Sequence, residues 1–263
     1  MRIYLELGIR AFRQLFAYQA AMLAGIFTNS IFGVMLSAVY LALYQSQDAG
    51  AAVAGFTAQQ TVTYVWIGQA LIAPVMIWGW WEIIKTIRSG AVVTDMLKPT
   101  SFFGFWMSRD LGRAVGHFIL RGIPTLFVGS LLFDLVYPGS AARWLAFFIS
   151  IWFAVIVSFC FRFMMNLWGF WVLDHRGIAG IATVLVGVFS GHLLPLAWYP
   201  NPIRDVLNML PFRAIIMLPV ELWLGQVGII EGLGLQMFWI VVMVMAALWL
   251  ESVAERKVVV QGG

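Results

Sequence analysis

Three long stretches of this chain carry no Asp, Glu, Lys or Arg, and their length limits what the chain can fold into. They cover residues 14–47, 49–81 and 177–203. About 20 apolar residues in a helix cross the hydrocarbon core of a bilayer, so each stretch is long enough for a crossing. The composition agrees, because 62% of the residues are hydrophobic and 11% are charged, whereas soluble domains have about 45–50% and 25%. We therefore predict an all-α integral membrane protein whose single domain covers residues 1–263.

The hydrophobic segments predict six transmembrane helices. Pro74 is expected to kink the second of them, because proline removes a backbone hydrogen bond. Residues 1–19 come before the first helix and carry Arg2, Glu6 and Arg10 on one face, which predicts an amphipathic helix in the membrane interface. The six helices are placed at about residues 20–44, 62–81, 114–135, 144–168, 178–194 and 227–250.

The distribution of basic residues predicts which way the helices run. Outside the six helices, eleven Lys and Arg residues fall on one side of the membrane and three on the other. Short loops rich in Lys and Arg stay in the cytoplasm. An even number of crossings puts both chain ends on one side, so the N and C termini are predicted to be cytoplasmic.

The longest charged segment, residues 82–113, is expected to lie in the cytoplasm because it is too polar for lipid. Gly90 suits the end of a short helix, and Pro99 forces Lys98 toward an extended conformation. Two interpretations stay open. The segment is either a shaped projection that a partner protein grips or an amphipathic connector whose basic residues hold anionic lipid.

A proline-rich segment, residues 195–226, separates the last two predicted helices on the outer side. Asn201 and Pro202 predict a helix start, and Pro211 and Pro219 are expected to break each helix that follows. Each apolar piece is too short to cross the membrane, which predicts re-entrant helices that dip into the outer leaflet. The alternative is a hydrophobic external loop packed on the bundle.

A few polar residues fall inside the predicted helices. Arg121 and Arg162 lie about seven residues, or ~10 Å, inside the cytoplasmic ends of the third and fourth helices. They either reach the inner interface or line a wet inner cavity as candidate pathway residues. His117 and His192 are isolated from other ligand types and Cys160 is the only cysteine, so no metal site and no disulfide are expected.

Catalytic motifs are missing from the sequence. Ser190, Gly191 and His192 are adjacent, so on a helix the Ser and His side chains point about 100° apart and do not form a catalytic pair. The chain has no GxxxxGK[ST] phosphate-binding loop and cannot hydrolyse ATP by that means. We expect no catalytic residue, no bound cofactor and no nucleic-acid partner. If the protein pumps, a separate subunit supplies the energy.

Three short motifs follow one another along the chain. Ser89 and Gly90 precede Leu97, Lys98 and Pro99; Ser190 and Gly191 precede Pro195, Leu196 and Pro200; Leu210, Pro211 and Phe212 come last. Together with the amphipathic and proline-rich segments, they resemble the membrane subunits of type-2 ABC exporters, and more closely a bacterial permease family of the ABC-2 type. The resemblance covers essentially the whole chain.

This resemblance implies a permease that forms half of a translocation pathway in the bacterial cytoplasmic (inner) membrane. A second permease, identical or homologous, would form the other half. Two ABC ATPase subunits, which carry the ATP and Mg²⁺, would dock from the cytoplasm. The exported substrate would be a lipophilic drug, as in multidrug efflux, a natural product or a lipid-like molecule.

The resemblance also implies roles for particular residues. Coupling to the ATPase would involve Arg10, Arg13, Ser89, Gly90, Asp95, Leu97, Lys98 and Pro99. The outer gate would involve Ser190, Gly191, Pro195, Tyr199, Pro200, Pro211, Phe212 and Pro219.

Other classes of membrane protein are the alternatives. An ion-coupled secondary transporter normally needs charged groups near the middle of the membrane and internal repeats, and neither is evident. An intramembrane enzyme needs a nucleophile and a base brought together from different helices. A structural membrane anchor or assembly factor is the third alternative.

Overall fold

The computed structural model describes residues 2–45, 52–76, 80–172 and 176–257. The structure is 82% helical, and no β-strand occurs among the described residues. This confirms the all-α prediction.

Seventeen helical segments follow one another along the described chain, and most connections between them are short. η2 is a π-helix that joins α6 to α7 without a break, so that one rod runs from Phe102 to Leu132. In chain order the elements are α1 (Arg2–Gln14), η1 (Leu15–Tyr18), α2 (Gln19–Gln45), α3 (Ala58–Val75), α4 (Glu82–Ser89), α5 (Val92–Met96), α6 (Phe102–His117), η2 (Phe118–Gly122), α7 (Ile123–Leu132), α8 (Ala141–Leu167), η3 (Trp168–Phe170), α9 (Arg176–Phe189), η4 (Leu196–Trp198), α10 (Asn201–Asn208), η5 (Pro211–Ala214), α11 (Met217–Leu224) and α12 (Ile229–Glu255).

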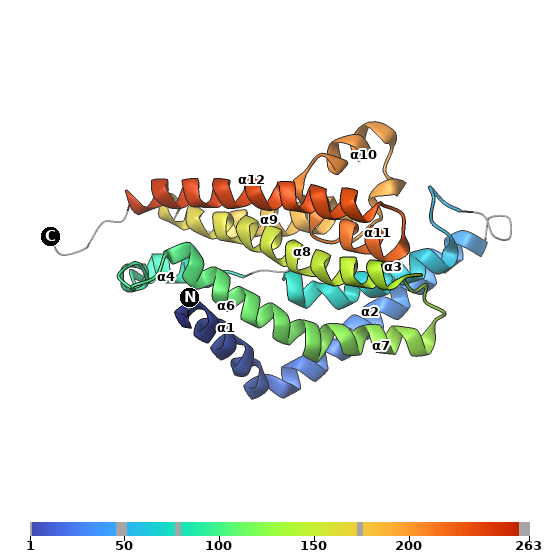
Figure 1. Ribbon diagram of the computed structural model, residues 1–263, viewed down its shortest axis with the longest axis horizontal. Helices are drawn as coiled ribbons and strands as arrows, with labels where there is room; N and C mark the ends of the chain where they lie inside the picture. Colours follow the sequence, from blue (N-terminus) through green and yellow to red (C-terminus); the bar gives the residue numbers. More distant parts are fainter. Residues whose placement is uncertain (1, 46–51, 77–79, 173–175, 258–263) are drawn as a thin grey trace.

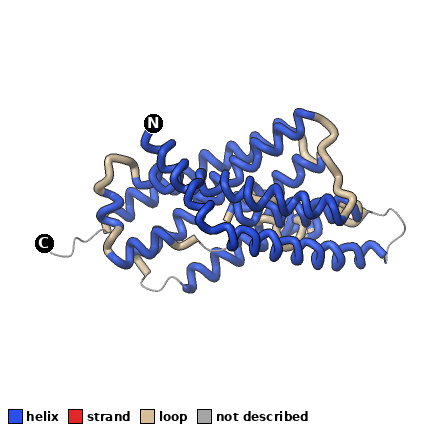
Figure 2. Tube along the Cα trace, turned by 90° about the horizontal axis from the view of Figure 1, so that it is seen from below, coloured by secondary structure: helices blue, strands red, loops and turns tan. Residues whose placement is uncertain are grey.

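The long helices lie side by side along the longest axis of the molecule (Figure 1). α8 packs between α12 and α6, and its Ala154, Phe159 and Phe163 are 0% exposed. Figure 2 shows the same bundle as almost continuous helix, with the loops gathered at its ends. The start of α1, the α4 helix and the end of α12 lie toward one end of the bundle, and α11 lies toward the other (Figure 1).

Four helices in the described part of the chain are long and apolar enough to cross a membrane. Large apolar side chains face outward along them, as lipid contact requires, and Phe27 and Trp249 are each 67% exposed. The predicted second crossing corresponds to α3, which carries polar residues such as Gln69. The predicted fifth crossing corresponds to α9, which has only 14 residues. Neither is among the four helices, so the count of six crossings stays a prediction. The four helices are Arg2–Gln45, Phe102–Leu132, Ala141–Phe170 and Ile229–Glu255.

The predicted second crossing is wrong at its C-terminal end. α3 begins at a capping box in which Thr57 and Gln60 bond each other's backbone, and it ends at Val75. Pro74 lies in its last turn and Met76 adopts a left-handed conformation with φ 52°. The helix therefore ends one residue after Pro74, at a left-handed C-cap, and the predicted kink at Pro74 stays a prediction.

The helix that contains the predicted third crossing begins twelve residues before its predicted start at residue 114. α6 begins at Phe102, where the Ser101 side chain accepts a hydrogen bond from the Gly104 amide. Residues 102–113 carry the charged side chains, such as Asp110, that predicted a segment too polar for lipid. They are tolerated because they pair with one another in the interior.

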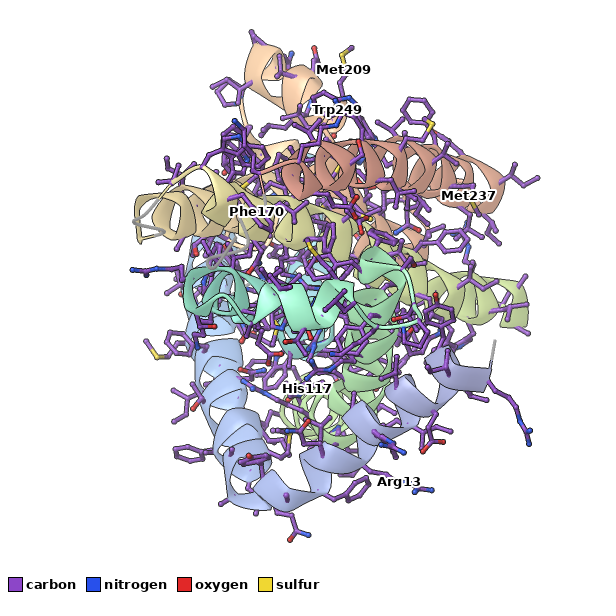
Figure 3. All side chains as sticks on the ribbon, turned by 90° about the vertical axis from the view of Figure 1, so that its left-hand side faces the viewer. Arg13, His117, Phe170, Met209, Met237 and Trp249 are labelled. Carbon is purple, nitrogen blue, oxygen red and sulfur yellow. The ribbon has the colours of Figure 1, made fainter. Side chains whose placement is uncertain are left out.

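The proline-rich outer segment forms short helices, as predicted, but two details differ. α10 begins at Asn201 with Pro200 as its N-cap residue, so the side chain of Asn201 does not cap it. Pro219 lies in the first turn of α11 and does not break it, since a first-turn amide has no partner within its own helix. α11 is buried in the bundle, whereas α10 projects from it with Met209 near its tip (Figures 1 and 3).

Candidate functional site

Charged side chains from two helices meet inside the bundle. The Asp110 carboxylate of α6 accepts hydrogen bonds from Arg162 of α8 at 3.1 and 2.8 Å and from Nε of Arg113 at 2.9 Å. The side chains of Asp110, Arg162 and Arg113 are 0%, 7% and 12% exposed. We call these three residues the arginine–aspartate cluster. Arg162 and Asp110 form a bidentate ion pair, which is a strong form of charge-assisted hydrogen bonding.

The cluster also closes the C-terminal end of α3. Arg113 donates to the carbonyls of Ala73 at 2.8 Å and Pro74 at 3.0 Å, and the Ser158 hydroxyl donates to the carbonyl of Val75. The last carbonyls of a helix have no partner within it and carry partial negative charge. A buried guanidinium there satisfies both the hydrogen bonds and the charge, and so ties α3 to α6.

The chain that follows this break is fastened to α8 by Asn166. Its Oδ1 accepts from the amide of Ile84 at 3.1 Å, and its Nδ2 donates to the carbonyls of Trp80 and Arg162 at 2.8 Å each. All of these groups are buried. The start of α4 is therefore held rigidly against the end of α8.

α4 and α5 form a small projection that we call the α4–α5 hairpin, residues 82–99. α4 ends at Gly90, whose φ of 75° confirms the predicted helix end. Lys98 pairs with Asp95, and its Nζ lies 3.9 Å from the ring centre of Phe105 at the base of α6. Leu97 is 80% exposed, so the hairpin presents one large apolar side chain outward. Ser89, Gly90 and Pro99 are exposed beside it.

The N-terminal helix docks on the base of α6. α1 crosses α6 where Gly8 meets Gly112, and a Cβ on Gly112 would overlap the backbone of Gly8. The Tyr4 hydroxyl accepts a hydrogen bond from the Ser101 amide at 3.2 Å, two residues from the end of the hairpin. The predicted coupling residues Arg10 and Arg13 are exposed on this helix, where Arg10 pairs with Glu6 at 3.1 Å and Arg13 points away from the bundle (Figure 3).

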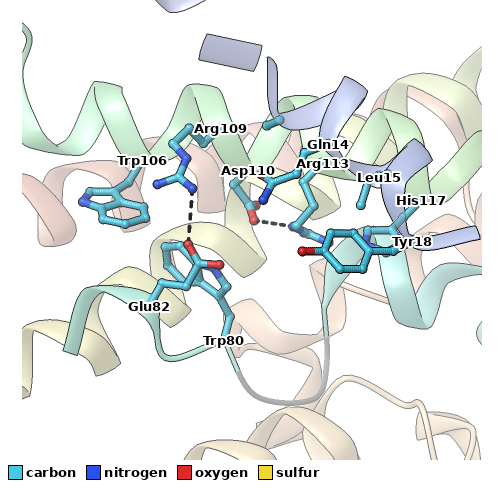
Figure 4. A pocket seen from close by; sticks show the side chains of 11 residues that line it. Gln14, Leu15, Tyr18, Trp80, Glu82, Trp106, Arg109, Asp110, Arg113 and His117 are labelled. Carbon is cyan, nitrogen blue, oxygen red and sulfur yellow. Dashed lines mark hydrogen bonds and ion pairs between the residues drawn. The ribbon is translucent and has the colours of Figure 1, made fainter. Parts of the chain in front are cut away.

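A cavity of about 160 Å³ lies between α1, η1, the start of α4 and α6. Figure 4 shows Arg109 reaching Glu82 across it, at 3.6 Å, and Arg113 near Tyr18. Rings of Trp80 and Trp106 form its other walls.

The predicted outer-gate residues gather at the opposite end of the bundle. The buried Tyr64 hydroxyl of α3 donates to the carbonyls of Gly191 and His192, and Tyr40 of α2 donates to the carbonyl of Leu193 at 2.6 Å. The backbone carbonyl of Ser190 accepts a hydrogen bond from the amide of Met217 at 3.1 Å. Two neighbouring helices therefore hold the turn that follows α9.

The rest of this outer segment is packed into the bundle to different depths. Phe212 packs edge-on against Phe161 and Phe189, with ring centres 5.1 and 5.8 Å away. Arg213 and Glu221 form a half-buried ion pair at 2.7 Å, although burial raises the pKa of the Glu221 carboxyl. Of the predicted gate residues, the buried ones are Ser190, Gly191, Pro195, Phe212 and Pro219, the half-buried ones are Tyr199 and Pro211, and the exposed one is Pro200.

The two predicted pathway arginines belong to separate networks. Arg162 is neutralised by Asp110, as described above. Arg121, in η2, donates to Asn29 of α2 at 2.9 Å, and Asn29 in turn donates to the carbonyl of Gln69 in α3 at 2.9 Å. Arg121 is therefore half-buried between helices with a neutral partner.

Sequence reasoning missed the residues that join these parts. Asp110 and Arg113 fall at the end of the charged segment 82–113, and their spacing of three residues is one that lets side chains pair on a helix. Tyr64 and Asn166 carry no signal of their own in a single sequence. Among the described residues, no three His, Cys, Asp or Glu side chains come together as metal ligands.

Comparison with known protein families gives a match over most of the chain. The model of the family described as ABC-2 family transporter protein matches residues 31–262. Neither the curated proteins nor the solved structures contain a match. Because the family match covers most of the chain and the helices are apolar enough to cross a membrane several times, the chain belongs to the ABC-2 family of transporter proteins and is a multi-pass membrane permease.

Proposed function

We propose that this permease forms half of the pathway of an ATP-driven exporter, and that a separate ABC ATPase subunit binds its α4–α5 hairpin. The observation that carries the proposal is the exposed Leu97, which follows α5 in a hairpin that is itself fixed to two long helices. A partner that receives Leu97 in an apolar pocket would bury most of this side chain, worth about 1.5–3 kcal/mol.

The contacts of the hairpin suggest how ATPase motion would reach the membrane. A push on the hairpin would act on α6 through Lys98 and Phe105 and on α8 through Ile84 and Asn166. The arginine–aspartate cluster joins both helices to the end of α3. Because packed elements switch between discrete arrangements, such a push favours one rigid-body state of the bundle over another.

α3 would carry the same motion to the outer gate. Its Tyr64 holds the carbonyls of Gly191 and His192, so that a shift of α3 moves the turn before the proline-rich segment. In this proposal residues 190–219 open outward when the inner side closes. A second permease completes the pathway, and Arg121 lines it. The exported substrate is a lipophilic drug, a natural product or a lipid-like molecule. The protein lies in the inner membrane with both chain ends in the cytoplasm.

The test is co-purification with a candidate ATPase subunit. Leu97→Glu should abolish retention of the ATPase, because it puts a charge where an apolar pocket is expected. Ile230→Glu is the matched control, since Ile230 is 90% exposed at the far end of the bundle and should leave retention unchanged. Equal retention by wild type and Leu97→Glu contradicts the proposed contact.

A further inference from the structure

The cavity beside the N-terminal helix has polar groups that the proposed coupling does not use. Its volume of about 160 Å³ is far more than the ~10–15 Å³ that one water needs. Nδ1 of His117, which lines it, has no hydrogen-bond partner among the described residues. Arg109 lies over the ring of Trp106, 4.8 Å from its centre, and meets the half-exposed carboxylate of Glu82 at 3.6 Å, which is longer than a charge-assisted hydrogen bond. The Arg109 side chain, which is 33% exposed, can therefore take a ligand, and the buried Nδ1 of His117 is an unsatisfied polar atom beside the same cavity.

The charges around the cavity favour an anion. Arg109 and Arg113 line it and Arg162 lies behind Asp110, so three guanidinium groups face the two carboxylates of Glu82 and Asp110. Asp110 is shared by two arginines. The carbonyl end of α3 offsets part of the remaining positive charge, because a helix C-terminus carries about half a negative charge. The charge that is left is still positive, which favours an anionic ligand over a neutral or cationic one.

An apolar groove adjoins the cavity. It has a volume of about 300 Å³ and is lined by Phe16, Met22, Ile26 and Leu120. Leu15 lines both the cavity and the groove. His117 of the cavity and Leu120 of the groove are three residues apart on one helical path and so share a face. The polar cavity therefore lies next to the apolar groove, which runs beside α2.

We propose that an anionic phospholipid occupies this site, with its phosphodiester in the cavity and an acyl chain in the groove. Arg109 and Nδ1 of His117 bind the phosphodiester, and Tyr18 and Trp80 flank the headgroup. The lipid fills the space between α1 and α6 and so fixes the N-terminal helix beside the α4–α5 hairpin. This assignment is independent of the exporter mechanism, and its test needs no ATPase.

The test is native mass spectrometry of the full chain in detergent, after delipidation, with three probes: dioleoyl phosphatidylglycerol, dioleoylglycerol and inorganic phosphate. Wild type should bind one phosphatidylglycerol in preference to dioleoylglycerol. Arg109→Gln and His117→Phe should each weaken this binding about tenfold, the loss expected for one charge-assisted contact. Met22→Trp, which fills the groove, should weaken it comparably.

Arg2→Gln is the matched control, because it removes the same charge from an exposed position on α1. It should change phosphatidylglycerol binding less than twofold. Equal binding by Arg109→Gln and wild type, or equal binding of dioleoylglycerol and phosphatidylglycerol, overturns the proposal. Displacement of the lipid by inorganic phosphate at comparable concentration assigns the cavity to a soluble anion and also overturns it. Thermal unfolding of each variant confirms that a loss of binding is not a loss of fold.

Discussion

Asp110→Asn keeps the shape of the side chain but removes the negative charge that lies between Arg113 and Arg162. The wild-type carboxylate accepts three hydrogen bonds, at 2.9, 3.1 and 2.8 Å, and its side chain is 0% exposed. Breaking a buried ion pair by removing one partner costs about 3–5 kcal/mol, because the charge left behind is neither solvated nor paired. Asparagine keeps one acceptor oxygen, so we expect the lower end of this range, about 3 kcal/mol.

Adding Arg162→Met tests whether the cost comes from the unpaired charge. This second change removes one of the two guanidinium groups that Asp110→Asn leaves without a counterion, and methionine fills a similar apolar volume. The double variant should be less destabilised than the sum of the two single variants, with a coupling energy of about 2 kcal/mol. Arg113 stays bonded to the carbonyls of Ala73 and Pro74.

The assay is equilibrium unfolding of the purified protein in detergent, followed by tryptophan fluorescence. Glu6→Gln is the control, since its pair with Arg10 is exposed and such pairs contribute at most about 1 kcal/mol. If Asp110→Asn is as stable as Glu6→Gln, or if the free-energy losses of Asp110→Asn and Arg162→Met simply add, the cluster does not hold the bundle together as described.

Three further predictions concern the parts that the cluster connects. Gly112→Ala should lower the unfolding free energy by about 1–3 kcal/mol and expose α1 to proteolysis, because the new Cβ would overlap the backbone of Gly8; unchanged proteolysis contradicts the docking. Gly90→Ala should lower transport per ATP hydrolysed, since alanine in its left-handed conformation costs about 1–2 kcal/mol. Gly55→Ala is the control and should leave this ratio unchanged, because Gly55 has φ 87° and the same open surroundings but lies outside the hairpin. Equal effects of the two variants refute a coupling role. Tyr64→Phe should leave two buried carbonyls with one fewer donor and lower the unfolding free energy by about 1–3 kcal/mol. The measurements are thermal unfolding and the accessibility of the outer segment. If neither changes, Tyr64 does not hold that segment.

The features that single residues determine were predictable. Gly90 ends a helix because glycine adopts the left-handed conformation without strain, and Asn201 with Pro202 starts a helix because the proline amide needs no partner there. The amphipathic pattern of Arg2, Glu6 and Arg10 likewise predicted the helix at α1. Each of these signals is local, so no tertiary contact is needed to interpret it.

The features that depend on tertiary pairing were not predictable. A single sequence does not show that Asp110 of α6 pairs with Arg162 of α8, so hydropathy alone does not predict that Asp110 is buried in the bundle. The same holds for the end of α3, where buried donors such as Ser158 and Arg113 make a break near Pro74 stable. Polar residues that pair with one another by hydrogen bonds lower the hydropathy of a helix, yet the helix can still be buried in the bundle.

The most direct test of the account is transport by proteoliposomes that contain this permease and a candidate ABC ATPase subunit. We expect a lipophilic compound to stimulate ATP hydrolysis and to be moved across the membrane only when ATP is present. Transport that proceeds on an ion gradient without an ATPase, or a permease that neither binds nor stimulates any ATPase, would contradict the account.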